Sequence, residues 1–378
     1  MSMFVKNDDL PVASAVAVGP AASAPPFEDV QHVQPQQDHS VLDNWLTSQG
    51  FPPGLIAALR ESSISFPRRI WIVDNSGSMN TEDGHRVVGE GENMKFIGCT
   101  RWRELGDTVE YHSEISGRAG WNTEFRLLNH PGRNFPQTFS ANSPGDIDKV
   151  RRIMTESRPT GCTPLTKHLR AIREDFNDTN YVNQLRSNGQ RVVIVVATDG
   201  MPTDEQGYAN AMVQQEFKNT LDSFGGLPVW IVIRLCTDDD EICNYYNDID
   251  EQLEIDLEVL DDFVGEGEEV FGCNPWVNYC LPIQRIREFG FHDKVFDLID
   301  ERLLSRSDLR AYIAILTNKS VREVPDPSLD WLAFSKYADE AIRPLGKLYD
   351  PNKKRPAKLV DLAVMATSYG EGGWCSIM

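Results

Sequence analysis

Oxygen-bearing side chains gather in three short segments of this sequence. The first is a D-x-S-x-S run at 74–78, the second is a T-G-x-T-P-L run at 160–165, and the third is a T-D-G run at 198–200. Carboxylate and hydroxyl oxygens are the ligands that hard divalent cations such as Mg²⁺ prefer. By average composition, the D-x-S-x-S spacing alone arises by chance in roughly one chain in ten of this size. Its weight therefore comes from the strand before it and from the order of the three segments.

The elements around these segments predict that they meet at one edge of a sheet. A short β-branched strand at 69–73 ends at Asp74, and a continuously apolar strand at 191–197 ends at Thr198. Further strands are expected at 123–128 and 229–233, with a short edge partner at 137–140, and helices at about 100–118, 145–157, 163–176 and 207–224. This alternation predicts an α/β fold with a doubly wound, mostly parallel, Rossmann-like sheet and helices on both faces. Such sheets bind ligands beyond the carboxyl ends of their strands.

Taken together, the three segments resemble the von Willebrand factor type A (vWA) domain and its metal-ion-dependent adhesion site. The resemblance covers about residues 67–275 and implies a module that binds one Mg²⁺ or Mn²⁺ and, through the ion, an Asp or Glu of a partner protein. Carried over by position, the implied metal ligands are Asp74, Ser76, Ser78, Thr163 and Asp199. Thr160 competes for the place of Thr163, but Thr163 stands directly before Pro-Leu and matches the motif better. Cys162 is unusual for this family.

The chemistry of this ligand set favours a role in binding another protein. Mg²⁺ takes six oxygen ligands, and because hydroxyls are neutral they leave the ion able to accept a carboxylate from another protein. In the alternative interpretation, Asp74 and Asp199 only cap helices, while Ser76 and Ser78 fill a turn.

A catalytic alternative is a Mg²⁺-dependent hydrolase of the haloacid-dehalogenase-like phosphatase type, which also starts from a strand-end aspartate. That chemistry needs a second carboxylate two residues later, where this chain has Ser76, and a hydroxyl is no general acid at neutral pH. The sequence has no Walker, kinase or Gly-x-Ser-x-Gly motif, and its seven histidines show no ligand spacing. The sequence therefore predicts a binding protein that is not an enzyme. A third hypothesis is a lipid-anchored scaffold whose metal site does not function.

The charge of the chain limits its partners. Its 378 residues carry 37 basic and 57 acidic side chains, for a net charge of −20, which argues against a nucleic-acid-binding surface. Fifteen carboxylates lie between 237 and 272, where there is no lysine or arginine. We interpret this stretch as a solvated face, the alternative being a patch for a basic partner. The predicted organisation is a disordered tail (1–40), a helical hairpin (41–66), the vWA domain (67–275), a helical extension (276–346) and a basic linker with a C-terminal motif (347–378).

The C-terminus predicts lipidation. Cys375-Ser376-Ile377-Met378 fits the C-a-a-X pattern, with methionine favouring a farnesyl group on Cys375. One lipid gives only marginal membrane binding, and a nearby basic cluster would add attraction to an anionic leaflet; its members are Lys353, Lys354, Arg355 and Lys358. The first residues lack a signal-peptide pattern, and an odd number of cysteines without a C-x-x-C pair predicts neither disulfides nor zinc. We expect a cytoplasmic protein that associates reversibly with the cytosolic face of a membrane.

Overall fold

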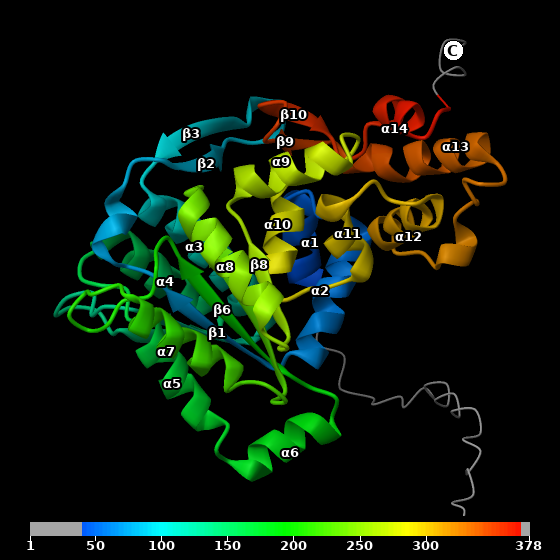
Figure 1. Cartoon of the computed structure of the whole chain (residues 1–378). Helices are drawn as coiled ribbons and strands as arrows, with labels where there is room; N and C mark the ends of the chain where they lie inside the picture. Colours follow the sequence, from blue (N-terminus) through cyan, green and yellow to red (C-terminus); the bar gives the residue numbers. More distant parts are fainter. Residues whose placement is uncertain (1–39, 372–378) are drawn as a thin grey trace, which may run out of the picture. The chain divides into compact units, whose positions relative to one another are not determined.

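The computed structural model describes residues 40–371. The tail predicted at 1–40, apart from Ser40, and the lipidation site Cys375 lie outside the described residues. Figure 1 shows the order of the elements along the chain.

The described part of the chain is built on a six-stranded sheet with the order β5-β4-β1-β6-β7-β8. Its strands are β1 (Arg68–Val73), β4 (Asn122–Leu127), β5 (Thr138–Ala141), β6 (Val192–Thr198), β7 (Val229–Leu235) and β8 (Leu257–Leu260). All neighbours pair in parallel except β5, which runs antiparallel to β4 at one edge. Val73 at the end of β1 pairs with Leu127 of β4 and Ala197 of β6, so the carboxyl ends of three strands meet at one edge. The predicted α/β fold with a mostly parallel sheet is confirmed.

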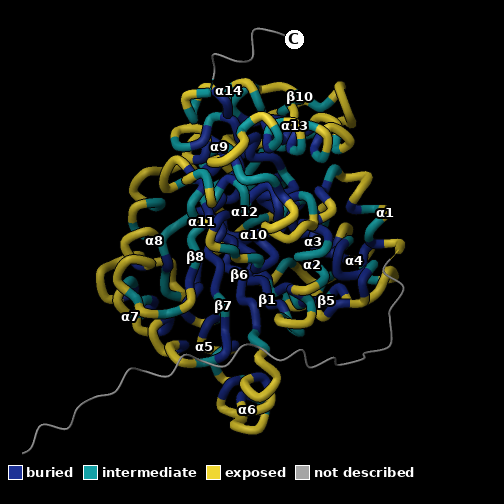
Figure 2. The backbone as a smooth tube through the Cα atoms, turned by 90° about the vertical axis from the view of Figure 1, so that its right-hand side faces the viewer, coloured by how far each residue is buried: buried dark blue, intermediate teal, exposed yellow. Residues whose placement is uncertain are grey.

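Helices cover both faces of this sheet. Ile70 and Ile72 of β1 pack into one core, whereas Trp71 and Val73 pack into another, as the alternation of side chains along a strand requires. The first face carries α5 (Leu165–Asp175), α6 (Thr179–Ser187), α7 (Ala211–Asp222) and α8 (Asp240–Gln252), and the second carries α3 (Arg101–Ala119) and α4 (Pro144–Glu156). Residues 192–197 of β6 are all fully buried, as the continuous apolar run predicted. Figure 2 shows the strands as a buried centre within exposed helices and loops.

A hairpin that the sequence analysis did not predict separates the D-x-S-x-S segment from α3. It consists of β2 (Gly84–Val88) and β3 (Lys95–Cys99), with the short 3₁₀ turns η1 (Gly77–Asn80) before it and η2 (Gly91–Asn93) at its tip. The hairpin packs on a second two-stranded sheet of β9 (Lys347–Asp350) and β10 (Arg355–Lys358), as Figure 1 shows. Phe96 stacks on Tyr349 with 5.5 Å between ring centroids, and Lys347 pairs with Glu92 at 2.8 Å.

The remaining helices form a shared core beside the sheet. The C-terminal ones are α9 (Phe263–Cys273), α10 (Leu281–Glu288), α11 (Lys294–Glu301), α12 (Arg306–Thr317), α13 (Trp331–Ile342) and α14 (Leu362–Ser368), with 3₁₀ turns η3 (Val321–Glu323) and η4 (Arg343–Leu345). The N-terminal pair α1 (Ser40–Ser48) and α2 (Pro53–Ser65) forms at the predicted helical hairpin and packs into this core, with α2 against α12. The helices predicted within 276–346 are present.

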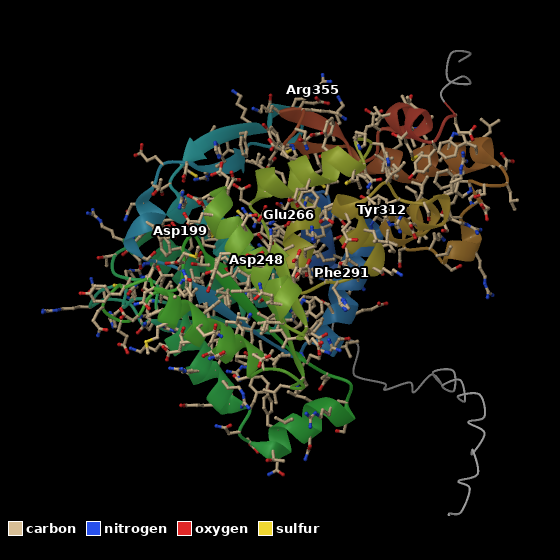
Figure 3. All side chains as sticks on the ribbon, viewed as in Figure 1. Asp199, Asp248, Glu266, Phe291, Tyr312 and Arg355 are labelled. Carbon is tan, nitrogen blue, oxygen red and sulfur yellow. The ribbon has the colours of Figure 1, made fainter. Side chains whose placement is uncertain are left out.

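The structure differs from the basic linker predicted at 347–378. Residues 347–368 instead form β9, β10 and α14, and Leu348, Val360 and Met365 are buried in the core beside the sheet. The lysines and arginines of this segment face outward from a folded hairpin, as Figure 3 shows for Arg355. Their charge made the segment look like a linker, although each strand also holds two adjacent apolar residues, Leu348 with Tyr349 and Pro356 with Ala357.

Candidate metal centre

The first loop of the candidate site begins where β1 ends. Asp74 is fully buried, and its backbone N–H donates to the carbonyl of Ala197 in the neighbouring strand at 2.9 Å. One carboxylate oxygen, Oδ1, accepts the backbone N–H of Ser76 at 2.7 Å. The other, Oδ2, accepts the hydroxyl of Thr198 at 2.7 Å. The carboxylate is therefore fixed at the end of the strand, between the loops that follow β1 and β6.

Hydroxyl contacts join this loop to the end of β6. The Ser76 and Ser78 hydroxyl oxygens lie 3.0 Å apart, and Ser78 donates to Asp199 Oδ1 at 2.8 Å. Asp199 is almost fully buried at the sheet edge, where Figure 3 labels it. The structure thus brings together four of the five predicted ligands.

The fifth residue, Thr163, lies on an adjoining loop. That loop is held against the first one because Gly77 N–H donates to the Gly161 carbonyl at 3.1 Å and Thr160 N–H donates to the Asn75 carbonyl at 2.7 Å. Thr163 is buried, yet its hydroxyl has no hydrogen-bond partner within residues 40–371. No direct contact joins this hydroxyl to Asp74 or Asp199 in the described part of the chain. The Thr163 hydroxyl oxygen is therefore available as a further metal ligand beside the other four.

An asparagine pair fixes the loop after β1, the loop after β4 and the loop before α5 relative to one another. The Asn75 amide donates to the Asn129 carbonyl at 2.9 Å, and the Asn129 N–H donates back to Asn75 Oδ1 at 2.7 Å. The Asn129 amide also donates to the Cys162 carbonyl at 2.7 Å, so one side chain bridges the loops after β4 and before α5. Gly161 has φ +90°, and a Cβ there would come within 2.5 Å of Asn129 Oδ1. Only glycine fits this position without strain.

The two buried carboxylates repel each other. Burial, followed by the nearby charge of Asp199, raises the pKa of Asp74 to about 6, although the hydrogen bonds from Thr198 and Ser76 act in the opposite direction. One cation partly balances the pair: Arg101 Nη1 lies 3.0 Å from Asp199 Oδ2. The same guanidinium donates twice to Asp83, so its charge is shared.

The residues fit a hard divalent cation. Two carboxylates and three hydroxyls are the donor types that Mg²⁺ takes, and a cation between Asp74 and Asp199 would relieve the repulsion that raises the pKa of Asp74. Among the described residues, no group of three or more His, Cys, Asp or Glu side chains is placed to hold a metal. A site here would therefore depend on its hydroxyls, a composition that suits Mg²⁺ or Mn²⁺ and not zinc.

Sequence reasoning missed several residues that complete the site. Arg101, Asn129 and Thr203 belong to no local motif, and all three contact residues far away along the chain: Arg101 by 98 positions, Asn129 by 33 and Thr203 by 40. Thr198 had a signal, because it is the first residue of the T-D-G segment. Its position just before Asp199 lets its hydroxyl reach back to Asp74.

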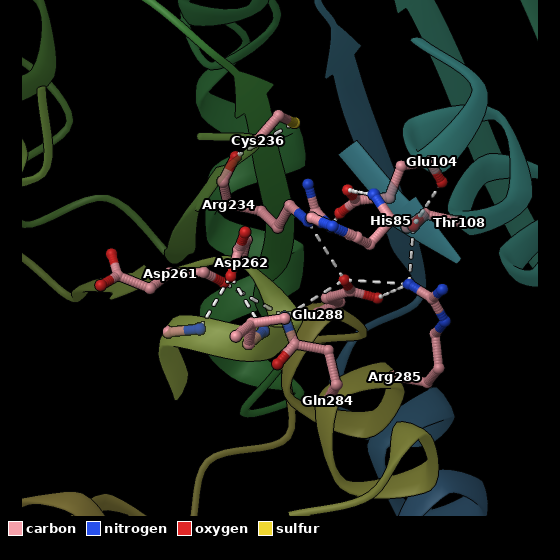
Figure 4. Close-up of polar contacts among 12 residues, drawn as sticks. His85, Glu104, Thr108, Arg234, Cys236, Asp261, Asp262, Gln284, Arg285 and Glu288 are labelled. Atoms are coloured by element: carbon pink, nitrogen blue, oxygen red, sulfur yellow. Dashed lines mark hydrogen bonds and ion pairs between the residues drawn. The ribbon is translucent and has the colours of Figure 1, made fainter. Parts of the chain in front are cut away.

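A buried ion network holds the helix that begins at Arg101. One turn into α3, Glu104 accepts Arg234 Nη2 from β7 at 2.6 Å and the His85 backbone N–H at 2.9 Å. Arg234 continues to Glu288, on which the dashed contacts in Figure 4 converge. Burial alone would raise the pKa of Glu288, but the Arg285 guanidinium and other polar partners hold it well below its usual range. The start of α3 is thereby fixed to the sheet.

The acidic stretch at 237–272 is folded and not uniformly solvated. It forms α8, β8 and α9, and Asp239 and Asp262 cap the two helices. Glu258 and Glu266 both pair with the buried Arg287, and burial raises the pKa of Glu266 to about 8. The interpretation as a solvated face therefore holds only for the exposed members of this stretch, such as Asp248, which Figure 3 labels.

The basic cluster is partly neutralised within the fold. Lys353 lies 3.3 Å from Asp361, and Lys358 lies 3.7 Å from Asp339. In the part of the chain that the structure describes, no helix combines the length and apolar character needed to cross a bilayer.

Comparisons with known proteins identify no family for this chain. No family model matches it, and no curated protein matches it in sequence. Among solved structures, it is similar to a mutant of the PilB minor pilin from Streptococcus sanguinis, with 12% sequence identity and a TM-score of 0.35. The similarity covers 51% of this chain and 56% of the pilin chain.

Proposed function

We propose that this chain is a vWA-type module that binds a partner protein through a divalent cation. Mg²⁺ or Mn²⁺ would be held by Asp74, Ser76, Ser78, Thr163 and Asp199, and an Asp or Glu of the partner would complete the coordination. The observation that carries the proposal is the connected set at the sheet edge: Ser76, Ser78 and Asp199 are linked by hydroxyl contacts beside Asp74.

Each residue has a defined task in this proposal. The ion would supply positive charge and an open coordination position. Ser76 N–H and Thr198 hold both oxygens of Asp74 in place, so that little rearrangement is needed on binding. Arg101 neutralises part of the negative charge of Asp199, and the hydroxyl ligands are neutral. The loops would therefore not cancel the positive charge of the ion, which could still attract a carboxylate from a partner protein.

The test is retention of a partner that depends on both metal and site. Crosslinking from cell lysate in Mg²⁺ is expected to capture a protein that is lost with EDTA and with Asp74→Ala. Glu82→Ala is the matched control, because Glu82 is an exposed acid on the same loop. Capture that persists in EDTA and in Asp74→Ala would instead support a scaffold whose metal loops do not function.

We further propose that Cys375 is prenylated and that the module associates reversibly with the cytosolic face of a membrane. One lipid gives marginal affinity, and the basic cluster contributes less than its four charges because Lys353 and Lys358 have acidic neighbours. Fractionation of wild type and Cys375→Ser at low salt tests this. Wild type is expected to be enriched in the membrane fraction, and identical partitioning of the two forms would contradict lipid anchoring.

A further inference from the structure

Two large apolar side chains are exposed on the segment that follows Asp199. The exposed fractions are 67% for Tyr208 and 80% for Met212, and both follow Asp199 within 13 residues. A single exposed apolar side chain is normal on a protein surface. A pair beside a proposed binding site is informative, because apolar groups at an interface supply much of the binding energy.

The loop that carries Tyr208 is fixed to the Thr163 loop. Thr203 and Thr163 exchange two hydrogen bonds of 2.9 Å, one from each backbone N–H. Asp204 closes a turn with Tyr208: Asp204 N–H donates to the Tyr208 carbonyl at 3.1 Å, and Tyr208 N–H donates to Asp204 Oδ1 at 2.9 Å. Gly207 has φ +88° and approaches Cys162 so closely that a Cβ there would lie 3.0 Å from the sulfur. The backbone at Tyr208 is thus held in place before any partner binds, while its side chain stays exposed.

Met212 stands at the start of α7, where Asn210 caps the helix by accepting its backbone N–H at 3.0 Å. Its backbone is fixed while its thioether side chain stays exposed. A flexible, polarizable side chain of this kind adapts to differently shaped apolar partners.

Two exposed arginines lie on the neighbouring loops. Arg133 is in the loop after β4, and Arg158 adjoins Pro159, whose carbonyl accepts the Asn80 amide of the first loop at 3.1 Å. Neither arginine forms a hydrogen bond or ion pair within residues 40–371. In a chain of net charge −20 this edge carries these two unpaired positive charges, opposed there by the exposed Glu82 and by Asp204, whose carboxylate accepts two backbone N–H groups and pairs with no cation among residues 40–371. Each of the two arginines is free to pair with an acidic side chain of a partner segment.

From this arrangement we propose the chemistry of the partner. It is an acidic protein segment in which the metal-binding carboxylate lies within a few residues of a large apolar side chain, which packs on Tyr208 and Met212. The inference rests on the proposed function and adds to it a determinant of specificity outside the metal ligands. Arg133 and Arg158 favour further acids in the same segment.

A peptide array tests this partner chemistry directly. Each peptide has a central Asp within a Gly/Ser background, with Leu, Phe, Lys, Glu or Ser placed at each of three positions on either side. The full chain is applied in Mg²⁺ and in EDTA, as wild type, as Tyr208→Ser/Met212→Ser and as the control Leu329→Ser/Leu332→Ser. The control residues are 87% and 60% exposed, so both double variants change only surface side chains.

Wild type and the control are expected to prefer Leu or Phe over Ser by about tenfold at one or more positions, in Mg²⁺ only. The Tyr208→Ser/Met212→Ser variant is expected to lose this preference while it still binds the Asp peptides in Mg²⁺. An unchanged preference in that variant, or binding that ignores apolar neighbours, overturns the inference and leaves the proposed function intact.

Two further outcomes separate the alternatives. If calorimetry of the same wild-type sample detects no Mg²⁺ uptake, the proposed function fails and this inference fails with it. If sedimentation shows Mg²⁺-dependent self-association that the Tyr208→Ser/Met212→Ser variant abolishes, a second copy of this chain occupies the surface. That result overturns the acidic partner segment.

Discussion

The charge of Asp74 is expected to make the metal-free chain less stable as pH rises. Burial raises the pKa of Asp74 in the folded chain to about 6 from its ordinary 3.8. The folded state therefore holds this proton more tightly than the unfolded state, so the free energy of unfolding falls as pH rises through this window. The full penalty is about 3 kcal/mol, of which about 1.4 kcal/mol falls between pH 5 and pH 7.5.

Comparison with Asp74→Asn isolates this penalty from those of other titrating groups. Unfolding by urea in EDTA gives the free energy of unfolding of both proteins at several pH values between 5 and 7.5. The free energy of unfolding of wild type minus that of Asp74→Asn is expected to decrease by about 1.4 kcal/mol as the pH rises over that range. The amide loses one acceptor that Asp74 offers to Ser76 and Thr198, which adds an offset independent of pH.

Magnesium supplies an internal check. At a concentration about 100 times its dissociation constant, an ion that binds only the folded state adds about 2.7 kcal/mol to the stability of wild type and none to Asp74→Asn. Glu82→Gln, which removes an exposed acid from the same loop, is expected to follow wild type throughout. A difference between wild type and Asp74→Asn that is constant or increases with pH in EDTA would refute the reasoning.

Three more predictions follow from the surroundings of the site. Arg101→Gln removes the cation that competes for Asp199 and is expected to tighten Mg²⁺ binding by roughly tenfold in calorimetry, whereas weaker binding would contradict that role. Gly161→Ala, at φ +90° and against Asn129, is expected to cost about 1–3 kcal/mol in urea unfolding and to weaken Mg²⁺ binding; wild-type behaviour in both would contradict the loop argument. Glu288→Gln removes the negative charge that pairs with the buried Arg234 and Arg285 and is expected to lower the free energy of unfolding by about 3–5 kcal/mol in the same assay. A loss below about 1 kcal/mol would contradict this role.

The sequence predicts this fold best where the same kind of side chain occupies every position of an element. The run at 192–197 is apolar on every residue because both faces of β6 are covered, and its position predicts that Asp199 lies at the sheet edge. The D-x-S-x-S segment follows a strand directly, so parallel pairing brings it to the same edge. Local pattern and parallel topology together were enough to locate Asp74, Ser76, Ser78 and Asp199.

The missed features depend on contacts between distant segments. Arg101 and Asp199 are 98 positions apart, and nothing in the local sequence of either shows that they pair. The hairpin at 84–99 has a polar tip and few buried side chains, so its pattern is weak until it packs on β9 and β10. The segment at 347–358 was misjudged because its strands are only four residues long and rich in basic residues, and their short apolar pairs, such as the buried Leu348 and Tyr349, give no strand pattern in the sequence.

The most direct test of the central claim is a titration of the purified chain with Mn²⁺, followed by electron paramagnetic resonance of the free ion. We expect one bound ion per chain, which Mg²⁺ displaces, which is lost in Asp74→Ala and Asp199→Ala, and which is retained in Glu82→Ala. No uptake by wild type, or uptake that both aspartate variants preserve, would contradict the claim that these loops form a metal centre.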